Sequence, residues 1–166
     1  GFCTFGKSPT CEDWDNIKAD VAFMGAPFDC GTQWRSGARM GPRSIREAST
    51  LFSFGHGGAY SFEDDTMYLQ GVKMVDMGDA DMIHTNTEQS HANIEYGVRK
   101  ALAAGVLPVV AGGDHSINAP CIQAFDDQGP IHIIQIDAHL DFVDERHGVR
   151  FGHGNPIRRA SEKTYV

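Results

Sequence analysis

The sequence predicts an α/β fold in which parallel strands alternate with helices. Short apolar runs recur along the chain, at residues 20–27, 72–77, 106–111 and 131–136. Stretches with apolar residues at helical spacing separate them, most clearly at residues 42–52 and 91–102. Strands that alternate with helices of this length predict βαβ units and therefore a parallel sheet.

The length and composition are those of one globular domain. The chain has 166 residues, 41% of them hydrophobic and 22% charged, and domains usually contain about 100–200 residues. It contains no run of about 18 apolar residues that would span a membrane. The formal net charge of −8 argues against nucleic acid as a partner, because phosphate binding requires clusters of Lys and Arg.

The chain opens without a recognisable signal peptide, and its cysteines show no metal-binding or C-x-x-C spacing. We therefore expect a cytoplasmic protein in which the thiols are free. The cysteines are Cys3, Cys11, Cys30 and Cys121.

The first third of the chain is expected to contain one strand and one helix. Residues 1–19 lack periodicity and predict an irregular arm, and residues 20–27 predict a buried strand that ends at Pro27. The Gly-rich residues 28–41 predict a structured loop. A helix is then expected to begin at Pro42 and to carry apolar residues at helical spacing up to the glycines of residues 55–58; these are Ile45, Ala48, Leu51 and Phe52.

The remaining elements follow in alternation. Residues 59–70 are acidic and aromatic and predict a surface loop, and residues 72–77 predict a short strand. A helix over 91–102 is expected to end at Gly105. The apolar residues 106–111 predict a buried strand. Another helix is expected from about Ile117, before the turn at Gly129-Pro130 and the final buried strand over 131–136.

Candidate metal ligands follow the last two predicted strands. Asp137, His139 and Asp141 occupy alternate positions, so their side chains share one side as long as the backbone stays extended. Two carboxylates and an imidazole suit a divalent ion such as Mn²⁺, Zn²⁺, Fe²⁺ or Ni²⁺. His115 follows the preceding strand, and ligands of open α/β sheets bind at the carboxyl ends of the strands. His132 lies an odd number of positions before Asp137, so its side chain points to the opposite face of the strand. We therefore expect it to pack in the interior.

Four motifs in order resemble those of the ureohydrolases, the arginase/agmatinase superfamily, and their agmatinase-like branch. They are the loop Gly31–Pro42 and the segments Gly112–Ser116, Asp137–Asp141 and Gly152–Pro156. The resemblance implies a three-layer α-β-α fold with a central parallel sheet and a homo-trimer or homo-hexamer. It also implies that residues 1–166 are the N-terminal portion of a single ureohydrolase domain, whose C-terminal half supplies two further Asp ligands.

The resemblance also implies the roles of the site residues. His115 and Asp141 would bind one metal ion, His139 the other, and Asp137 would bridge them. The ions would be two divalent cations, Mn²⁺ in the first place with Ni²⁺ as the alternative. A metal-bridging hydroxide would hydrolyse a guanidino compound to urea plus an amine or ammonia, and His153 would be the catalytic proton shuttle. Asp114 would orient its neighbours, and the substrate-binding residues remain unknown.

The substrate class follows from one departure from the arginase pattern. Arginases carry Asn two positions after the last Asp of the D-A-H-x-D motif, and this chain carries Val143. Arginine is therefore disfavoured, and an agmatine-like compound, a guanidino acid and guanidine stay open. The acidic Asp144 and Glu145 give agmatine a slight preference.

Two other hypotheses about the function compete with this one. A histone-deacetylase-like amide hydrolase has a similar fold and a D-x-H pattern, but it lacks the signatures at residues 31–42 and 112–116. The alternative from a different class is a non-catalytic metal-binding homologue, or a fragment with an incomplete site.

Overall fold

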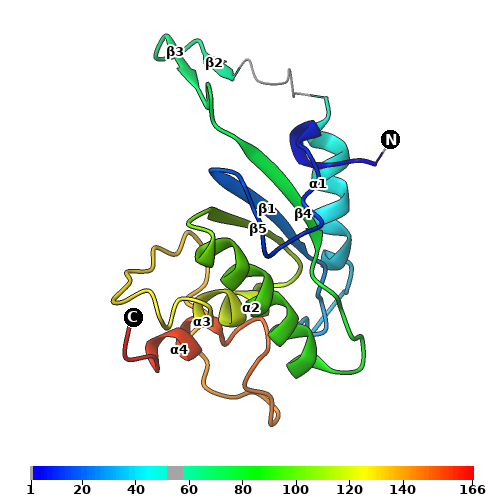
Figure 1. Ribbon diagram of the computed structural model, residues 1–166. Coiled ribbons are helices and arrows are strands. Elements are labelled where there is room, and N and C mark those ends of the chain that lie inside the picture. The colour runs from blue at the N-terminus through cyan, green and yellow to red at the C-terminus, as the bar shows by residue number, and fades with distance from the viewer. Residues whose placement is uncertain (1, 52–57) are drawn as a thin grey trace.

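A parallel sheet forms the centre of the molecule, as predicted. The computed structural model describes residues 2–51 and 58–166. Within them a three-stranded parallel sheet has the order β4–β1–β5 (Figure 1). Strand β1 (Val21–Ala26) is the middle strand, and it pairs in parallel with β4 (Met74–Asp79) and with β5 (Leu107–Gly112).

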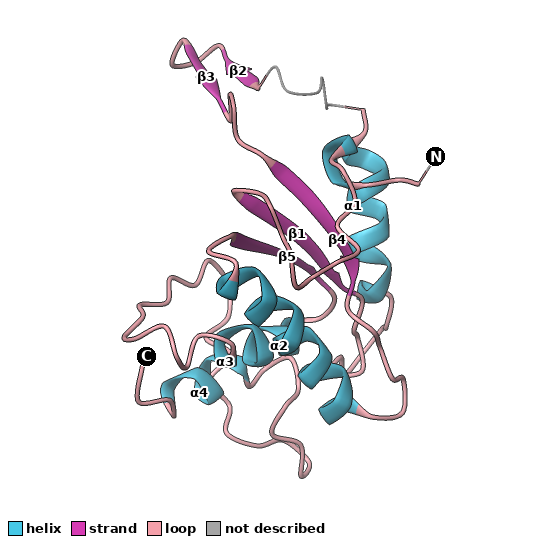
Figure 2. Ribbon diagram, viewed as in Figure 1, coloured by secondary structure: helices cyan, strands magenta, loops and turns pink. Residues whose placement is uncertain are grey.

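Helices cover both faces of this sheet, which gives the three-layer arrangement (Figure 2). Successive side chains of β1 point to opposite faces. Phe23 faces α1 (Gly41–Ser49), where its ring centroid lies 5.1 Å from the Arg46 guanidinium carbon. Met24 faces α2 (Thr87–Ala103) and lies so close to Gly97 that a Cβ there would be 2.3 Å from the methionine sulfur. Helix α3 (Asn118–Gln123) packs against α2.

The main hydrophobic core lies between the sheet and α2. The periodicity of residues 91–102 correctly predicts the buried stripe of this helix, which contains Ile94, Val98 and Ala101. The helix begins earlier than predicted, at Thr87, because Asn86 caps it: Asn86 Oδ1 accepts a hydrogen bond of 2.9 Å from the Gln89 N–H.

Helix α1 forms where expected, but its apolar stripe does not face the core. Ile45 and Leu51 are 42% and 75% exposed, whereas Arg46 is buried. The Arg46 guanidinium forms two hydrogen bonds with the Asp76 carboxylate of β4, at 2.8 and 2.9 Å, and a third contact with Asp79. An ion pair thus holds this helix against the sheet. The predicted Phe52 and most of the helix break at residues 55–58 lie outside the described residues.

Residues 59–70 are not a loop, contrary to the prediction, but a hairpin that projects away from the sheet (Figure 1). Strand β2 (Ala59–Ser61) pairs antiparallel with β3 (Thr66–Tyr68). The acidic residues that suggested a loop lie in the connection, where Asp65 and Asp64 accept hydrogen bonds from the hydroxyls of Tyr60 and Tyr68.

The strand predicted over residues 131–136 is also absent. Its residues alternate between half-buried and exposed, as extended backbone does, but they form no ladder with any described residue. Ile134 and Ile136 are 89% and 96% exposed, and His132 is exposed rather than packed. β-Branched residues favour extended backbone, but a strand also needs a pairing partner. Helix α4 (Pro156–Ser161) follows after residues 137–155.

The expectation about the cysteines is confirmed, because all four thiols are free. Burial raises the pKa of Cys121 to about 12. Among the helices of the described segments, none has the length and apolar composition needed to cross a membrane.

The buried ion pair of α1 can be tested by stability measurements. Arg46→Met leaves Asp76 as an unpaired buried charge, and we expect the free energy of unfolding to fall by about 3–5 kcal/mol. The control is Arg43→Met on the same helix, because Arg43 pairs with Glu47 where the two side chains are 75% and 57% exposed. We expect the control to cost at most about 1 kcal/mol. Equal losses in urea denaturation would contradict this account.

Candidate metal centre

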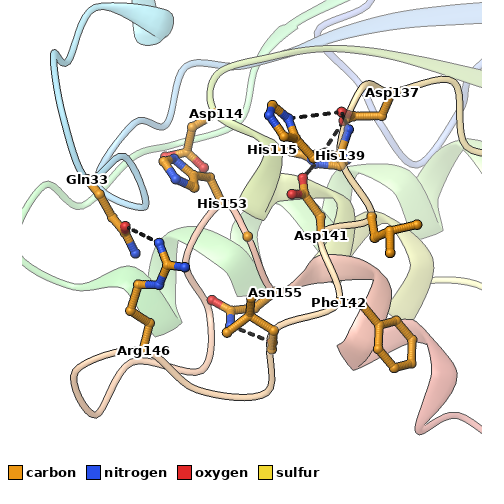
Figure 3. A pocket seen from close by; sticks show the side chains of 13 residues that line it. Gln33, Asp114, His115, Asp137, His139, Asp141, Phe142, Arg146, His153 and Asn155 are labelled. Atoms are coloured by element: carbon orange, nitrogen blue, oxygen red, sulfur yellow. Dashed lines mark hydrogen bonds and ion pairs between the residues drawn. The ribbon is translucent and has the colours of Figure 1, made fainter.

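A pocket of about 880 Å³ contains all the predicted site residues (Figure 3). Three parts of the chain form it: the loop after β1, residues 114–115 shortly after β5, and residues 137–155. The lining residues are Gln33, Asp114, His115, Asp137, His139, Leu140, Asp141, Phe142, Val143, Arg146, His153, Gly154 and Asn155.

Four of these residues meet around one carboxylate. His115, Asp137 and Asp141 each offer a possible ligand atom, and these atoms lie within 4.8 Å of one another. The His115 Nδ1 contacts the Asp141 carboxylate and lies 3.6 Å from Asp137 Oδ2. The other oxygen of Asp137, Oδ1, lies 3.5 Å from His139 Nδ1. The two oxygens of Asp137 thus face two different imidazoles.

The residues converge for a different reason than the sequence suggested. We predicted that extended backbone would place Asp137, His139 and Asp141 on one side. Instead the chain bends at residues 138–139, and Asp141 has a φ of +45°. Aspartate is one of the few residues other than glycine that adopts this left-handed conformation readily. The His139 side chain is 82% exposed, and its contact within the cluster is the one with the Asp137 carboxylate.

The charges of this cluster suit a cation. Asp137 and Asp141 approach the same imidazole, and no Lys or Arg of the described residues forms an ion pair with either of them. The pKa of Asp137 is lowered, chiefly by a hydrogen bond of 2.8 Å from the His139 N–H and further by the His115 and His139 imidazoles. Two carboxylates and two imidazoles are a suitable donor set for divalent first-row metals.

Asp114 is not among the clustered ligand atoms, and its oxygens bind backbone N–H groups instead. It is buried, and its carboxylate accepts hydrogen bonds from the Gly31 N–H at 2.7 Å and the Ser116 N–H at 2.8 Å. The Gly31 carbonyl in turn accepts a hydrogen bond of 3.2 Å from the His153 N–H. A Cβ at Gly31 would lie 2.7 Å from Ser116 Oγ, so the three segments meet too closely for a side chain at this position.

Asn155, which the sequence analysis did not single out, shapes the loop that carries His153. Its amide nitrogen donates to the Val143 carbonyl at 2.7 Å, and its amide oxygen accepts from the Gly152 N–H at 2.9 Å. The Val143 N–H also donates to the Gly154 carbonyl at 3.1 Å. These bonds fix the backbone on both sides of His153, whose ring lines the pocket (Figure 3).

Asn118 was missed as well, although it lies three positions after His115 on the first turn of α3. Its amide nitrogen Nδ2 lies 2.7 Å from His115 Nε2. A metal bound at Nδ1 requires the proton of this ring to be at Nε2. The Asn118 amide oxygen can accept that proton's hydrogen bond once the amide is turned, since an amide offers either a donor or an acceptor.

The fold and the cluster together define an α/β protein with a carboxylate–imidazole site at the ends of its strands. The arginase family model matches residues 19–166. The chain belongs to the arginase family, as the sequence motifs predicted.

A curated relative is the guanidino acid hydrolase, mitochondrial, of Homo sapiens. It is 34% identical over 98% of this chain, and the match covers 45% of that protein. The chain thus spans about half the length of the curated relatives it matches. The cytoplasmic location stays a prediction, because the name of this relative gives a mitochondrial location.

Solved structures show the same fold. A hypothetical agmatinase from Burkholderia thailandensis superposes with a TM-score of 0.84 at 25% identity, over 100% of this chain and 51% of that one. A Trypanosoma cruzi formiminoglutamase solved with Mn²⁺ superposes with a TM-score of 0.75 at 29% identity, over 89% of this chain and 49% of the other. The predicted three-layer fold is therefore confirmed.

The role of Asn118 can be tested through metal affinity. Asn118→Leu removes the group that orients the His115 ring, and we expect Mn²⁺ to bind about 10–100-fold more weakly to the full-length protein. Asn118→Asp keeps an acceptor at the same place and should retain the affinity. Calorimetric titration of the metal-free variants measures both. Unchanged affinity in Asn118→Leu would show that the contact has no such role.

Proposed function

We propose that the protein is a binuclear-metal amidinohydrolase that converts a guanidino compound to urea plus an amine or ammonia. The observation that supports this most directly is the Asp137 carboxylate, which lies between the imidazoles of His115 and His139. Membership of the arginase family and the similarity to a guanidino acid hydrolase support the same reaction.

The proposed ligands divide between two ions. His115 and Asp141 would hold one ion, His139 would hold the other, and Asp137 would contribute to both. We propose Mn²⁺ for both positions, with Ni²⁺ as the alternative; the Mn²⁺ named with the T. cruzi formiminoglutamase structure supports the first choice. Imidazole and carboxylate ligands are compatible with either metal.

The residues of the chain would each contribute one part of the reaction. Two bound divalent ions lower the pKa of a water molecule so that hydroxide is available as a nucleophile near neutral pH. His153 donates a proton to the leaving nitrogen as the carbon–nitrogen bond of the guanidino group breaks. Its position in the loop is set by the Gly31 carbonyl and by Asn155.

The substrate proposed is a guanidino compound without an α-amino-acid head. Val143 lines the pocket and offers no side-chain hydrogen bond to such a head. The slight preference for agmatine relied on Asp144 and Glu145, but neither residue lines the pocket. The Asp144 carboxylate instead contacts the Arg159 guanidinium on α4. Agmatine, a guanidino acid and guanidine therefore enter this proposal equally.

We further propose that residues 1–166 are the N-terminal portion of one ureohydrolase domain. The match to 45% of the guanidino acid hydrolase and to 51% of the agmatinase chain supports this division. The homo-trimer or homo-hexamer stays a prediction.

The bridging role of Asp137 predicts the largest effect of any single ligand change. Asp137→Asn in the full-length protein removes the charge shared by both ions, so we expect loss of at least one bound metal ion and of urea release. Elemental analysis beside a urea assay measures this. Asp127→Asn, which changes an exposed carboxylate outside the pocket, is the control and should behave as the wild type. Normal metal content and turnover in Asp137→Asn would refute the assignment. A wild-type protein that binds metal but releases no urea from any guanidino compound would favour the non-catalytic homologue.

His153 should affect turnover and not metal content. His153→Ala removes the proposed proton donor, and we expect kcat to fall by about 10²–10⁴-fold with the metal content of the wild type. The control is His84→Ala, because the exposed His84 does not line the pocket. If His153→Ala loses metal in proportion to activity, the residue is a ligand and the proposed role is wrong.

A further inference from the structure

The pocket contains an arginine that the reaction proposed above does not use. Arg146 lines the pocket that also contains the metal cluster. Its Nη1 donates a hydrogen bond of 3.0 Å to Oε1 of Gln33, which belongs to the loop after β1. Figure 3 shows the two side chains directed toward each other, on the side of the pocket away from Asp137 in that view.

Arg146 has no acidic partner within the described part of the chain. The carboxylate two positions before it, that of Asp144, forms ion pairs with three other arginines: Arg150, Arg158 and Arg159. Among the described residues, the Arg146 guanidinium forms its side-chain hydrogen bond with Gln33, which is neutral. Its remaining N–H donors are therefore available to an anion in the pocket.

The arginine is also held in place. Its backbone forms two hydrogen bonds with Val149, each of 3.0 Å, which close a narrow turn. The guanidinium is exposed and donates to the equally exposed Gln33. Its planar shape lets it bind a carboxylate through two parallel hydrogen bonds.

The charges in the pocket distinguish the three substrate types. The carboxylates of Asp137 and Asp141 mark the end where the guanidino group would react, and Arg146 adds a positive charge elsewhere on the wall. An agmatine tail ends in an ammonium, which Arg146 would repel. Free guanidine has no tail to contact it, whereas a tail that ends in a carboxylate meets an unpaired guanidinium.

We propose that Arg146 binds the tail carboxylate of an ω-guanidino acid and that the pocket therefore selects a guanidino acid over agmatine and guanidine. This inference rests on the proposed amidinohydrolase function. It replaces the agmatine preference drawn from the sequence, because Arg146 lines the pocket whereas Asp144 and Glu145 do not. Arg146 is then a specificity-determining residue, remote from the reacting carbon.

The experiment compares substrates with tails of similar length and opposite charge. Urea release from 4-guanidinobutyrate and from agmatine gives kcat/KM for the full-length, Mn²⁺-loaded wild type, for Arg146→Gln and for Arg146→Lys. We expect the wild type to prefer 4-guanidinobutyrate. Arg146→Gln should lower kcat/KM for this substrate by about 10–100-fold, the usual effect of losing a hydrogen bond to a charged group, while agmatine is unaffected or improved. Arg146→Lys should lose less, because lysine keeps the positive charge but lacks the two parallel N–H donors of the guanidinium.

The matched control is Arg150→Gln in the same loop. Arg150 pairs with Asp144 and Glu162 and does not line the pocket, so both substrates should keep their wild-type kcat/KM. A wild type that prefers agmatine, or an Arg146→Gln variant that loses activity equally on both substrates, would overturn the inference.

A second measurement separates this inference from the function it rests on. If neither compound nor guanidine releases urea, the proposed function fails, and the binding of 4-guanidinobutyrate to the metal-free protein still tests Arg146. Calorimetry should give a Kd for the wild type that is about 10–100-fold below that of Arg146→Gln. A wild type that binds no more tightly than this variant, or that does not bind at all, would overturn the role of Arg146.

Discussion

The shape of the pocket depends on the buried carboxylate of Asp114. It accepts hydrogen bonds from the backbone N–H groups of Gly31 and Ser116, and the Asp114 N–H donates to the Phe28 carbonyl at 2.8 Å. Through the Gly31 carbonyl the same network reaches His153. A buried carboxylate whose acceptors are satisfied by backbone amides is costly to disturb. Three segments that are distant in the sequence are therefore held together before any ligand arrives.

The sequence predicted those elements of the fold whose residues carry a local signal. The apolar runs at 20–27 and 106–111 became β1 and β5, and the stripe of α2 is buried as its spacing indicated. Helix α1 was located correctly, but its contact with the sheet was not predicted, because the buried group is Arg46 and its partner Asp76 lies far along the chain. The failure at residues 131–136 has the same cause, since strand pairing is a non-local property that composition does not report.

The site shows a similar division between local and non-local information. The residue types at 115, 137, 139 and 141 indicated metal ligands, and the structure brings them together around Asp137. The predicted extended backbone was wrong, because the chain bends at residues 138–139 and Asp141 is left-handed. Asn118 offered a usable signal, three positions after a candidate ligand on a helical turn. Asn155 lies within the Gly152–Pro156 motif, but its bonds to the Val143 carbonyl and the Gly152 N–H form only in the folded chain. Arg146 offered no such signal, because Gln33 lies far from it in the sequence.

The uncovered isoleucines of residues 131–136 have a consequence for handling the protein. The segment Ile-His-Ile-Ile-Gln-Ile is β-branched, has no formal charge at neutral pH and contains neither Pro nor Gly. Six-residue segments of this kind form dry zippers with identical copies when they are exposed. The described residues leave Ile134 and Ile136 open to solvent and supply no ladder partner. Residues 1–166 handled alone are therefore prone to β-aggregation at high concentration, and a polypeptide segment that covers residues 131–136 would suppress it.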